Sequence, residues 1–369
     1  MKIIYLLAAS YARGGIKICI EHCNRLAARG HVVEIFGRHP KPDWIDVRVP
    51  WTVAKDRLGS ELPQCDVVVF SFYEQAYFVT KAVLESGCVP VYFAQGDEVV
   101  FGDAEKAEGQ KERNSILAAQ ASLQMPYPLV TVSASAAARI EAFGGKDISV
   151  IPNGVDREVF GPQPRDNSVP RVFCVGAIRP LFKGIPDILG ALLKLRSEGM
   201  EFSLMRASPE PEEKIDLPFE VEFHHNPTQD ALARLYAGAD IFVGASSNES
   251  FYLPPLEAMA CGTAVVCSDL PVVREYAEPD QDFLPFPPGD VPALARQLRR
   301  ALRYPELRMR LADNGLAAAA KMDWEIIIPE YEKLFASFVQ RRDEIHKSLR
   351  SELKNPTVHW RIDGEESVH

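Results

Sequence analysis

The sequence lacks several features that would each point to a particular class of protein. No apolar run approaches the ~20 residues that a transmembrane helix needs, so we expect no membrane-spanning segment. Cysteine is scarce, with seven residues and no CxxC pair. We therefore predict buried, reduced thiols in a cytoplasmic protein. Basic residues are in deficit, because 41 Lys and Arg face 51 Asp and Glu, for a net charge of -10. Nucleic acid is not an expected partner, and any bound anion must be met by local groups.

Two common nucleotide-binding motifs are also absent. There is no GxGxxG, and the second predicted strand ends in Gly37-Arg38, without the acidic residue that contacts a ribose in NAD sites. The absence of GxxxxGK[ST] removes the usual NTPase interpretation. A DxD-like group, Asp280-Gln281-Asp282, lies in the proline-rich loop AEPDQDFLPFPPGD, where we do not predict a metal site. No metal or other cofactor is expected.

What the chain does contain is a regular alternation of apolar runs and amphipathic segments. The first forty residues give strand KIIYLLAAS, helix IKICIEHCNRLAARG with a glycine stop, and strand HVVEIFG. The opening run resembles the apolar part of a signal peptide, but charged and glycine-rich sequence follows without a cleavage pattern, so a buried strand is predicted. The same alternation recurs along the chain. It predicts an α/β protein with parallel, doubly wound sheets covered on both faces.

A break in this alternation predicts two domains. Residues 161–170, GPQPRDNSVP, read as a linker. We expect an N-terminal Rossmann-like domain at 1–160 and a C-terminal one at 170–324. A long helical segment at about 325–347 is expected to pack back on the first domain, and the polar end, 350–369, is expected to be disordered.

The stretch ESFYLPPLEAMACG carries two glutamates, Glu249 and Glu257, on either side of a Pro-Pro pair. On one continuous helix they would lie ~12 Å apart, too far for a shared acid/base pair. The prolines also argue against one helix, because Pro255 suits a first turn while Leu253 and Pro254 are expected to be extended or in a turn. This places Glu249 in a loop and Glu257 in the first turn of a helix. The N-terminus of that helix is a predicted phosphate site.

Each part of this site has an ordinary interpretation when taken alone. The stretch could be only a short buried helix, with Glu249 solvated and Glu257 favouring the helix N-terminus. In GAIRPLFKG, Lys183 follows the glycine turn at Gly176 and can reach a diphosphate, yet it could also be a solvated turn lysine. Gly14-Gly15 permits close approach of a phosphate but is also typical of a tight turn.

Taken together, these residues resemble a known family. The EX7E spacing from Glu249 to Glu257, the upstream GAIRPLFKG, IPNGVD at 151–156 and the N-terminal GGIK resemble glycosyltransferase family 4, also called glycosyl transferases group 1. The similarity extends to about residue 340. It implies the GT-B fold, two Rossmann-like domains facing across a cleft, and metal-independent, retaining transfer from a nucleotide-diphosphate sugar.

The resemblance also implies roles for individual residues. Glu257 corresponds to the carboxylate that accepts both ribose hydroxyls, and Glu249 to the residue that faces the donor sugar and favours positive charge at its anomeric carbon. Lys183 corresponds to the lysine that neutralises the leaving diphosphate, and Gly15 to a first-domain glycine that closes over it. The residues expected around the donor are Gly15, Arg179, Lys183, Ser250, Phe251, Tyr252, Leu253 and Glu257.

The chain departs from the family pattern inside the donor motifs. The family reads EGFG, but Ser250 and Tyr252 replace both glycines here, so we expect a narrower donor-sugar pocket or an added hydroxyl. An arginine commonly follows the glycine that corresponds to Gly176, where this chain has Ala177. Arg179 is expected to supply that charge from two residues further along.

A third departure concerns the acceptor. The loop FAQGDEVVFG lacks the histidine that many members place there. Asp97 or Gln95 is expected beside the acceptor, although both could be ordinary loop residues. We therefore group Asp97 with Glu249 and Lys183 as catalytic candidates. Loops at 44–56 and 95–113 follow strand ends and are expected to set acceptor specificity.

The leading hypothesis is thus an active glycosyltransferase. A ribose contact favours a UDP- or GDP-sugar, and the acceptor hydroxyl could belong to a glycan, a lipid-linked intermediate or a small molecule, with at most peripheral membrane contact. A catalytically silent nucleotide-sugar-binding protein or regulatory subunit is the main alternative. A phosphorylase of the same architecture would need a lysine in a pyridoxal phosphate context, and none is present.

Overall fold

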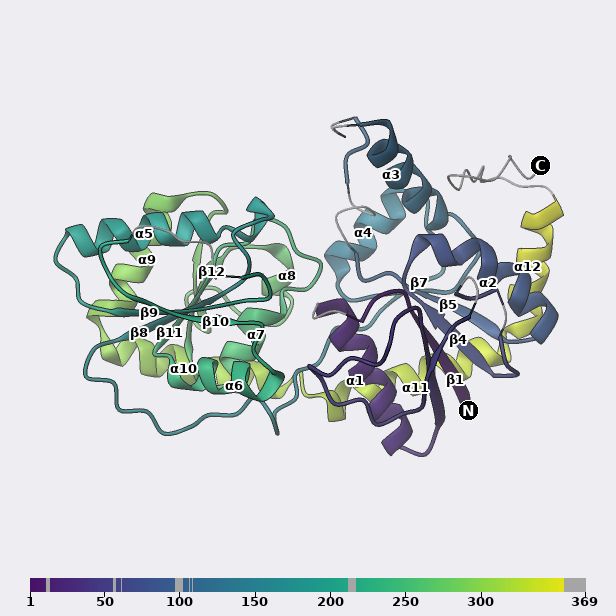
Figure 1. Ribbon diagram of the computed structural model, residues 1–369, viewed down its shortest axis with the longest axis horizontal. Coiled ribbons are helices and arrows are strands. Elements are labelled where there is room, and N and C mark those ends of the chain that lie inside the picture. The colour runs from purple at the N-terminus through teal and green to yellow at the C-terminus, as the bar shows by residue number, and fades with distance from the viewer. Residues whose placement is uncertain are drawn as a thin grey trace. The chain divides into compact units, whose positions relative to one another are not determined.

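The chain forms two compact units in a computed structural model that describes residues 1–10, 14–55, 58–60, 62–96, 102–105, 107, 109–211 and 217–354. Unit 1 comprises Met1–Pro152 and the chain from Ile327 onward, and unit 2 is Asn153–Ile326. Figure 1 shows that each unit has helices on both faces of a central sheet.

Unit 1 is built on a seven-stranded sheet in the order β3-β2-β1-β4-β5-β6-β7, in which every neighbouring pair is parallel. Its strands are β1 (Lys2–Leu7), β2 (Val32–Gly37), β3 (Trp51–Val53), β4 (Val67–Phe70), β5 (Val89–Phe93), β6 (Leu129–Thr131) and β7 (Ile148–Val150). The first strand is buried along five of its six residues, as a strand covered on both faces must be. The direction of winding reverses between β1 and β4.

The helices of unit 1 alternate with these strands and then close the chain. They are α1 (Gly14–Ala28), α2 (Tyr73–Ser86), α3 (Gln110–Ser122), α4 (Ala134–Ala142), α11 (Trp324–Gln340) and α12 (Arg342–Lys354). Local sequence fixes several ends: Ser133 accepts a hydrogen bond from the Ala136 N–H at the start of α4, and Gly87 ends α2 in the left-handed conformation.

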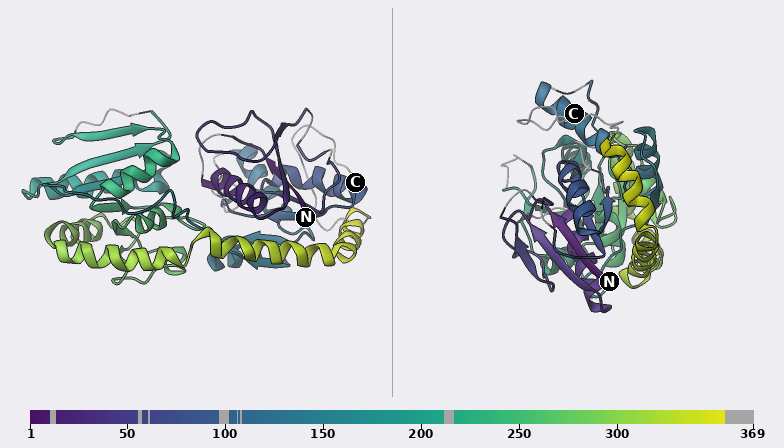
Figure 2. Two further views of the ribbon diagram at one scale, coloured as in Figure 1. Left: turned by 90° about the horizontal axis from the view of Figure 1, so that it is seen from below. Right: turned by 90° about the vertical axis from the view of Figure 1, so that its right-hand side faces the viewer.

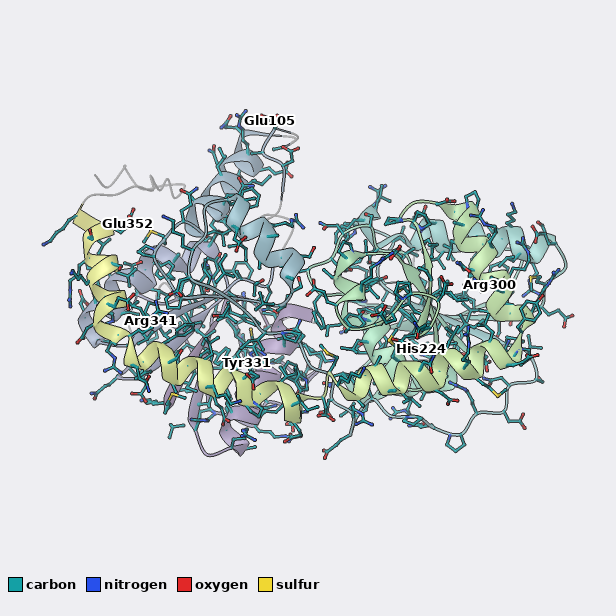
Figure 3. The ribbon with its side chains drawn as sticks, turned by 180° about the vertical axis from the view of Figure 1, so that it is seen from behind. Glu105, His224, Arg300, Tyr331, Arg341 and Glu352 are labelled. Carbon is teal, nitrogen blue, oxygen red and sulfur yellow. The ribbon has the colours of Figure 1, made fainter. Side chains whose placement is uncertain are left out.

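The two C-terminal helices pack on unit 1 (Figures 2 and 3). The Arg341 guanidinium donates to both oxygens of Asp147, at 3.1 and 2.9 Å, and the ring of His346 contacts the Cys88 carbonyl at 2.8 Å. Because Leu349 is fully buried, α12 continues to Lys354. The expectation of disorder is therefore wrong for residues 350–354, and residues 355–369 lie outside the described part of the chain.

Unit 2 contains a six-stranded sheet in the order β10-β9-β8-β11-β12-β13, again wholly parallel. The strands are β8 (Arg171–Val175), β9 (Ser203–Ser208), β10 (Val221–His225), β11 (Ile241–Gly244), β12 (Ala264–Ser268) and β13 (Phe283–Phe286). The helices are the 3₁₀ turn η1 (Leu181–Lys183) and α5 (Ile185–Ser197), α6 (Gln229–Gly238), α7 (Leu253–Ala260), α8 (Pro271–Arg274), α9 (Val291–Arg303) and α10 (Pro305–Ala320). Winding reverses between β8 and β11, and both units are thus the predicted doubly wound α/β sheets.

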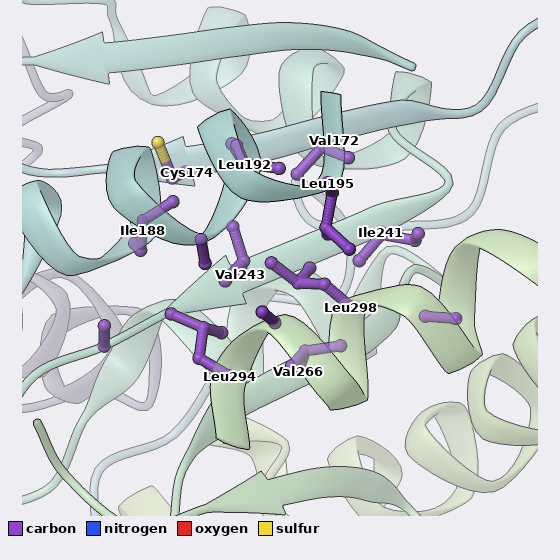
Figure 4. Close-up of a cluster of buried hydrophobic side chains, with 14 of the residues drawn as sticks. Val172, Cys174, Ile188, Leu192, Leu195, Ile241, Val243, Val266, Leu294 and Leu298 are labelled. Carbon is purple, nitrogen blue, oxygen red and sulfur yellow. The ribbon is translucent and has the colours of Figure 1, made fainter. Parts of the chain in front are cut away.

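A dry apolar cluster fixes one face of the unit 2 sheet (Figure 4). Side chains of α5 and α9, including Leu192 and Leu298, interlock with strand residues such as Val243 and Val266, and all four are fully buried. The transfer of such side chains from water contributes about 1.5–3 kcal/mol each. The cluster holds α5, and with it the turn that precedes this helix, rigidly against the sheet.

The cysteines and helices agree with the expectations drawn from composition. All seven cysteines are buried and free, which confirms the prediction of structural thiols. In the described part of the chain, none of the helices is long and apolar enough to cross a bilayer.

A histidine buried in unit 1 makes its stability depend on pH. His22 of α1 is fully buried, and burial lowers its pKa to about 3. Its ring lies 4.2 Å from the Tyr331 ring of α11 and 5.2 Å from that of Phe93, and Nδ1 is 3.3 Å from the Tyr5 hydroxyl. The neutral ring is thus part of the packing between α1, the sheet and α11.

We predict that acidification destabilises unit 1 through His22. The unfolded chain takes up a proton below a pKa of about 6.5, whereas the folded chain does so only near 3. The free energy of unfolding should therefore fall by about 1.4 kcal/mol per pH unit from about pH 6.5 downward. Urea unfolding of His22→Phe should lose that part of the slope, while the exposed-site control His39→Gln keeps it. Identical slopes in the wild type and His22→Phe would contradict the assignment.

Candidate donor site

The predicted donor residues of unit 2 gather where its winding reverses. Lys183 ends η1, in the connection from β8 to α5, and Glu249 lies in the connection from β11 to α7. Strands β8 and β11 are hydrogen-bonded neighbours. In doubly wound sheets, ligands bind beyond the carboxyl ends of the strands at such a reversal point.

Lys183 and Glu249 form an ion pair across these two connections. The lysine Nζ donates to the glutamate Oε1 over 2.8 Å. The side chains are 35% and 16% exposed, so the pair lies at the surface without being fully solvated. The lysine ammonium also lies 4.9 Å from the centre of the Phe182 ring. The structure therefore brings together two residues that the sequence places 66 positions apart.

A close backbone contact holds the two connections together. Gly184 has a φ of +67°, and a Cβ atom built on it would lie 2.1 Å from the Ala245 carbonyl oxygen. In the same contact, the Ser247 N–H donates to the Phe182 carbonyl at 2.8 Å. Only glycine combines this left-handed backbone with this approach. The position of Lys183 relative to Glu249 is thus set by main chain as well as by the ion pair.

Tyr252 occupies the turn before α7 in an unexpected way. Its φ of +69° is the left-handed conformation that glycine favours, and its side chain is buried. The Tyr252 hydroxyl accepts the Ser246 N–H at 3.3 Å, and a Cβ on Gly244 would lie 2.2 Å from it. The ring therefore fills the space that Gly244 leaves. The Tyr252 side chain thus packs toward β11, and its effect on a donor-sugar pocket stays a prediction.

The remaining residues of the motif form the entry to α7. Phe251 is buried, with its ring 5.5 Å from that of Tyr276, and Ser250 is half-buried. The Tyr276 hydroxyl donates to the Tyr252 carbonyl at 2.9 Å, which holds the turn. Tyr252, the residue before the helix, provides no side-chain cap for the helix N–H groups. The N-terminal dipole of α7 is consequently available to an anion.

The start of α7 corrects one local prediction. The helix begins at Leu253, so Leu253 and Pro254 are helical and not extended. The N–H groups in the first turn of a helix have no hydrogen-bond partner within that helix. A proline, which lacks an N–H, can therefore occupy this turn without the loss of a hydrogen bond. Glu257 consequently lies at the fifth helical position. It is 5% exposed, and its negative charge adds to burial in raising the pKa of the neighbouring Tyr236 on α6.

In unit 1, two of the singled-out residues are in contact. The Gln95 side-chain amide donates to the Gly15 carbonyl at 3.1 Å, and a Cβ on Gly15 would lie 3.3 Å from the same nitrogen. This ties the start of α1 to the end of β5. Asp97 lies outside the described residues.

Arg179 is exposed on the connection that carries Lys183. No motif predicts Arg206, a charged residue that follows Leu204 and Met205 in β9, although its guanidinium donates to the Gly176 carbonyl of the same connection. An arginine inside an apolar run was the only sequence signal for it.

The sequence around this site matches a known protein family. Residues 156–317, which make up most of unit 2, match the family model described as Glycosyl transferases group 1. These residues therefore form a domain that resembles the glycosyl transferases group 1. The recognised resemblance is thereby confirmed at the level of the family.

Relatives with a similar sequence include mannosyltransferases. An MMP alpha-(1→4)-mannosyltransferase from Mycolicibacterium hassiacum is 32% identical over 229 residues, which cover 58% of this chain and 55% of the relative. A phosphatidyl-myo-inositol mannosyltransferase from Mycobacterium tuberculosis is 28% identical over 205 residues, covering 52% and 54%. The match thus spans about half the length of these relatives.

Several solved structures share the fold of the whole chain. Sucrose-phosphate synthase from Thermosynechococcus elongatus superposes with a TM-score of 0.73 at 21% identity, covering 91% of this chain and 100% of that one. HepE from Anabaena, solved with UDP-glucose, gives a TM-score of 0.69 at 16% identity, covering 94% and 100%. The predicted GT-B fold with two Rossmann-like domains is confirmed.

Proposed function

We propose that this chain is a retaining, metal-independent glycosyltransferase that moves a hexose from a nucleotide-diphosphate sugar to a hydroxyl acceptor. The observation that carries the proposal is the ion pair between Lys183 and Glu249 at the winding reversal of a group 1 domain. A cation and a carboxylate at that point suit the two ends of such a donor, namely its diphosphate and its sugar.

In this proposal the diphosphate is held by charge and dipoles from the chain. Lys183 turns from Glu249 toward the phosphate oxygens, and the uncapped N-terminus of α7 faces them. The leaving group is then neutralised without a metal ion. The carboxylates of the DxD-like segment have partners in and near their own loop. Asp282 accepts the Glu278 N–H at 2.8 Å, and Asp280 lies 3.7 Å from Arg300.

The transfer step breaks the bond between the anomeric carbon and the diphosphate oxygen, and the electron pair leaves with the diphosphate. The acceptor oxygen forms its bond on the same face, and its proton passes to the departing phosphate oxygen. Glu249, freed from Lys183, binds the sugar hydroxyls and stabilises positive charge on the anomeric carbon. Retention of configuration follows from attack on the face that the leaving group vacates.

Relatives and neighbours guide the choice of substrates to test. Two relatives are named as mannosyltransferases, one of them acting on phosphatidyl-myo-inositol, and one structural neighbour was solved with UDP-glucose. Mannose is therefore the first sugar to test, with UDP and GDP as carriers. The acceptor is a hydroxyl of a glycan, a lipid-linked intermediate or a small molecule, and we assign it to unit 1, near Gly15 and Gln95.

A thermal-shift screen tests the donor assignment. A ligand that binds only the folded chain raises its melting temperature, so UDP- or GDP-sugars should stabilise the chain and dTDP-sugars should do so less. Incubation of the stabilising donor with candidate acceptors, followed by NMR of the product, should show the anomeric configuration of the donor. An inverted product would contradict the retaining mechanism, and the absence of stabilisation by any nucleotide sugar would contradict the donor site.

We predict that Glu257 makes the chain distinguish ribose from deoxyribose. A buried carboxylate on α7 that accepts both ribose hydroxyls should favour UDP over 2′-deoxy-UDP by about tenfold to a hundredfold, as expected for a hydrogen bond to a charged group. Titration calorimetry of Glu257→Gln should show a smaller preference, and the exposed control Glu201→Gln should keep that of the wild type. If GDP is the carrier, the same comparison applies to GDP. Equal wild-type affinity for the ribose and deoxyribose forms would exclude the contact.

A further inference from the structure

A buried arginine in unit 2 has too few partners for its charge. Arg206 is the fourth residue of β9, in register with Cys174 on β8 and Phe223 on β10. It is only 4% exposed. Arginine is almost never this deeply buried unless it is paired, because taking its charge out of water is costly.

The contacts of Arg206 leave most of its donors unused. Nη2 donates one long hydrogen bond, 3.5 Å, to the Gly176 carbonyl, and Nε has no acceptor. The guanidinium carbon lies 5.3 Å from the centre of the Phe223 ring. Across the residues that the structure describes, no carboxylate lies within ion-pair distance of Arg206. Among the described residues, the five N–H donors of this guanidinium thus meet one acceptor, the Gly176 carbonyl.

The arginine lies against the same turn as Lys183. Gly176 follows β8 with a φ of +141°, and a Cβ built on it would lie 3.9 Å from the Cβ of Lys183. Arg206 therefore approaches this turn from the neighbouring strand, while Lys183 approaches it from η1. Ala177, next in the chain, contributes only a methyl group. Two cations thus flank one glycine turn at the carboxyl ends of the strands.

We propose that Arg206 is a phosphate-binding residue of the donor site, which acts with Lys183 on the diphosphate. Its guanidinium supplies, from β9, the charge for which Ala177 has no side chain, while Arg179 stays in solvent. A planar guanidinium suits bidentate binding of phosphate oxygens, and an incoming diphosphate would provide the missing counter-ion. The inference rests on the proposed function, because it assumes a nucleotide-diphosphate donor.

The test compares Arg206→Met with the wild type and with the control Arg303→Met, which changes an exposed arginine at the end of α9 in the same unit. The probes are UDP, GDP, uridine, guanosine and inorganic pyrophosphate, titrated by calorimetry or NMR. Arg206→Met should weaken the preferred nucleoside diphosphate and pyrophosphate by about tenfold to a hundredfold and the nucleoside by less than about twofold. Arg303→Met should change each of these affinities by less than about twofold.

The unliganded stability gives an independent readout. Removing a buried charge that lacks a counter-ion should leave the melting temperature of Arg206→Met equal to or above that of the wild type. A purely structural arginine predicts the opposite. Arg206→Lys, which keeps the charge but loses the planar fork, should bind the diphosphate with intermediate affinity.

The outcomes separate the two proposals. If the wild type binds UDP or GDP and Arg206→Met binds it equally well, this inference is overturned and the donor assignment stands. A destabilised or unfolded Arg206→Met, with Arg206→Lys binding like the wild type, would also overturn it in favour of a structural role. If Arg206→Met lost equal affinity for the nucleoside and for the nucleoside diphosphate, Arg206 would contact the base and not the phosphates, and the proposal would be overturned. A wild type that binds none of the probes would overturn the proposed function itself.

Discussion

Replacement of Glu249 by alanine is expected to abolish sugar transfer while nucleoside diphosphate binding is retained or becomes tighter. In the unliganded chain the Glu249 carboxylate holds Lys183 Nζ at 2.8 Å, so it competes with a diphosphate for this ammonium. Without the carboxylate, the lysine is free for the phosphate, but the positive charge at the anomeric carbon is no longer stabilised. The loss of one such electrostatic group is expected to lower turnover by about a hundredfold to a thousandfold.

The measurement is turnover in a coupled assay for nucleoside diphosphate release, together with calorimetry of the nucleoside diphosphate. Glu249→Gln keeps the size of the side chain and loses its charge, and it should also be nearly inactive. Glu201→Ala, an exposed change in the same unit, should match the wild type. Transfer by Glu249→Ala within about twofold of the wild type would remove Glu249 from the mechanism. A wild type that binds donor without transfer would favour the catalytically silent alternative.

Gly184→Ala is expected to produce the largest loss of stability among single glycine substitutions in the donor site. The new Cβ would meet the Ala245 carbonyl oxygen at 2.1 Å, and the φ of +67° adds the strain of a left-handed alanine. The strain costs about 1–2 kcal/mol. Because the clash is with main chain, β11 or α5 must also shift, and we expect a total of about 4 kcal/mol. Displacement of the connection would also separate Lys183 from Glu249.

Gly199→Ala is the matched control, because Gly199 has a similar φ of +80° and nothing within 4 Å of a Cβ. Gly199→Ala should lower the free energy of unfolding only by the strain of a left-handed alanine. Urea unfolding of the two variants therefore isolates the backbone contact between the Lys183 and Glu249 connections. Donor affinity should fall in Gly184→Ala alone. Equal unfolding free energies for the two variants would mean that the contact yields easily and does not fix the site.

The main architecture was predictable because parallel strands covered on both faces are apolar throughout. Strands β1, β4 and β5 are buried along nearly their whole length, and each was visible as an apolar run. By contrast, the three residues of β3 are exposed or half-buried at the edge of the sheet, and α3 begins with a polar, exposed turn. β3 lies within one expected loop, 44–56, and α3 begins within the other, 95–113, since neither carries the apolar periodicity on which the prediction depends.

The sequence singled out two residues, Lys183 and Glu249, that the structure brings together, whereas features decided by packing were not predicted. The ion pair joins two motif residues, and the winding reversal brings their connections together. The direction of the Tyr252 side chain depends on the empty space at Gly244, which no local pattern reveals. Arg206 was not predicted for a related reason, because only the folded structure shows that this buried charge has no counter-ion among the described residues.

The return of the chain to unit 1 determines how the molecule can be divided. Unit 2 is one uninterrupted segment, 153–326, whereas unit 1 is completed by α11 and α12, whose Tyr331 covers His22. Unit 2 is therefore a continuous domain inserted into the chain of unit 1. Because unit 2 is continuous, residues 153–326 can be produced alone by truncating the chain at both ends. Unit 1 requires a splice, in which a short linker joins residue 152 to 327, because a simple truncation after residue 152 would leave its buried histidine uncovered.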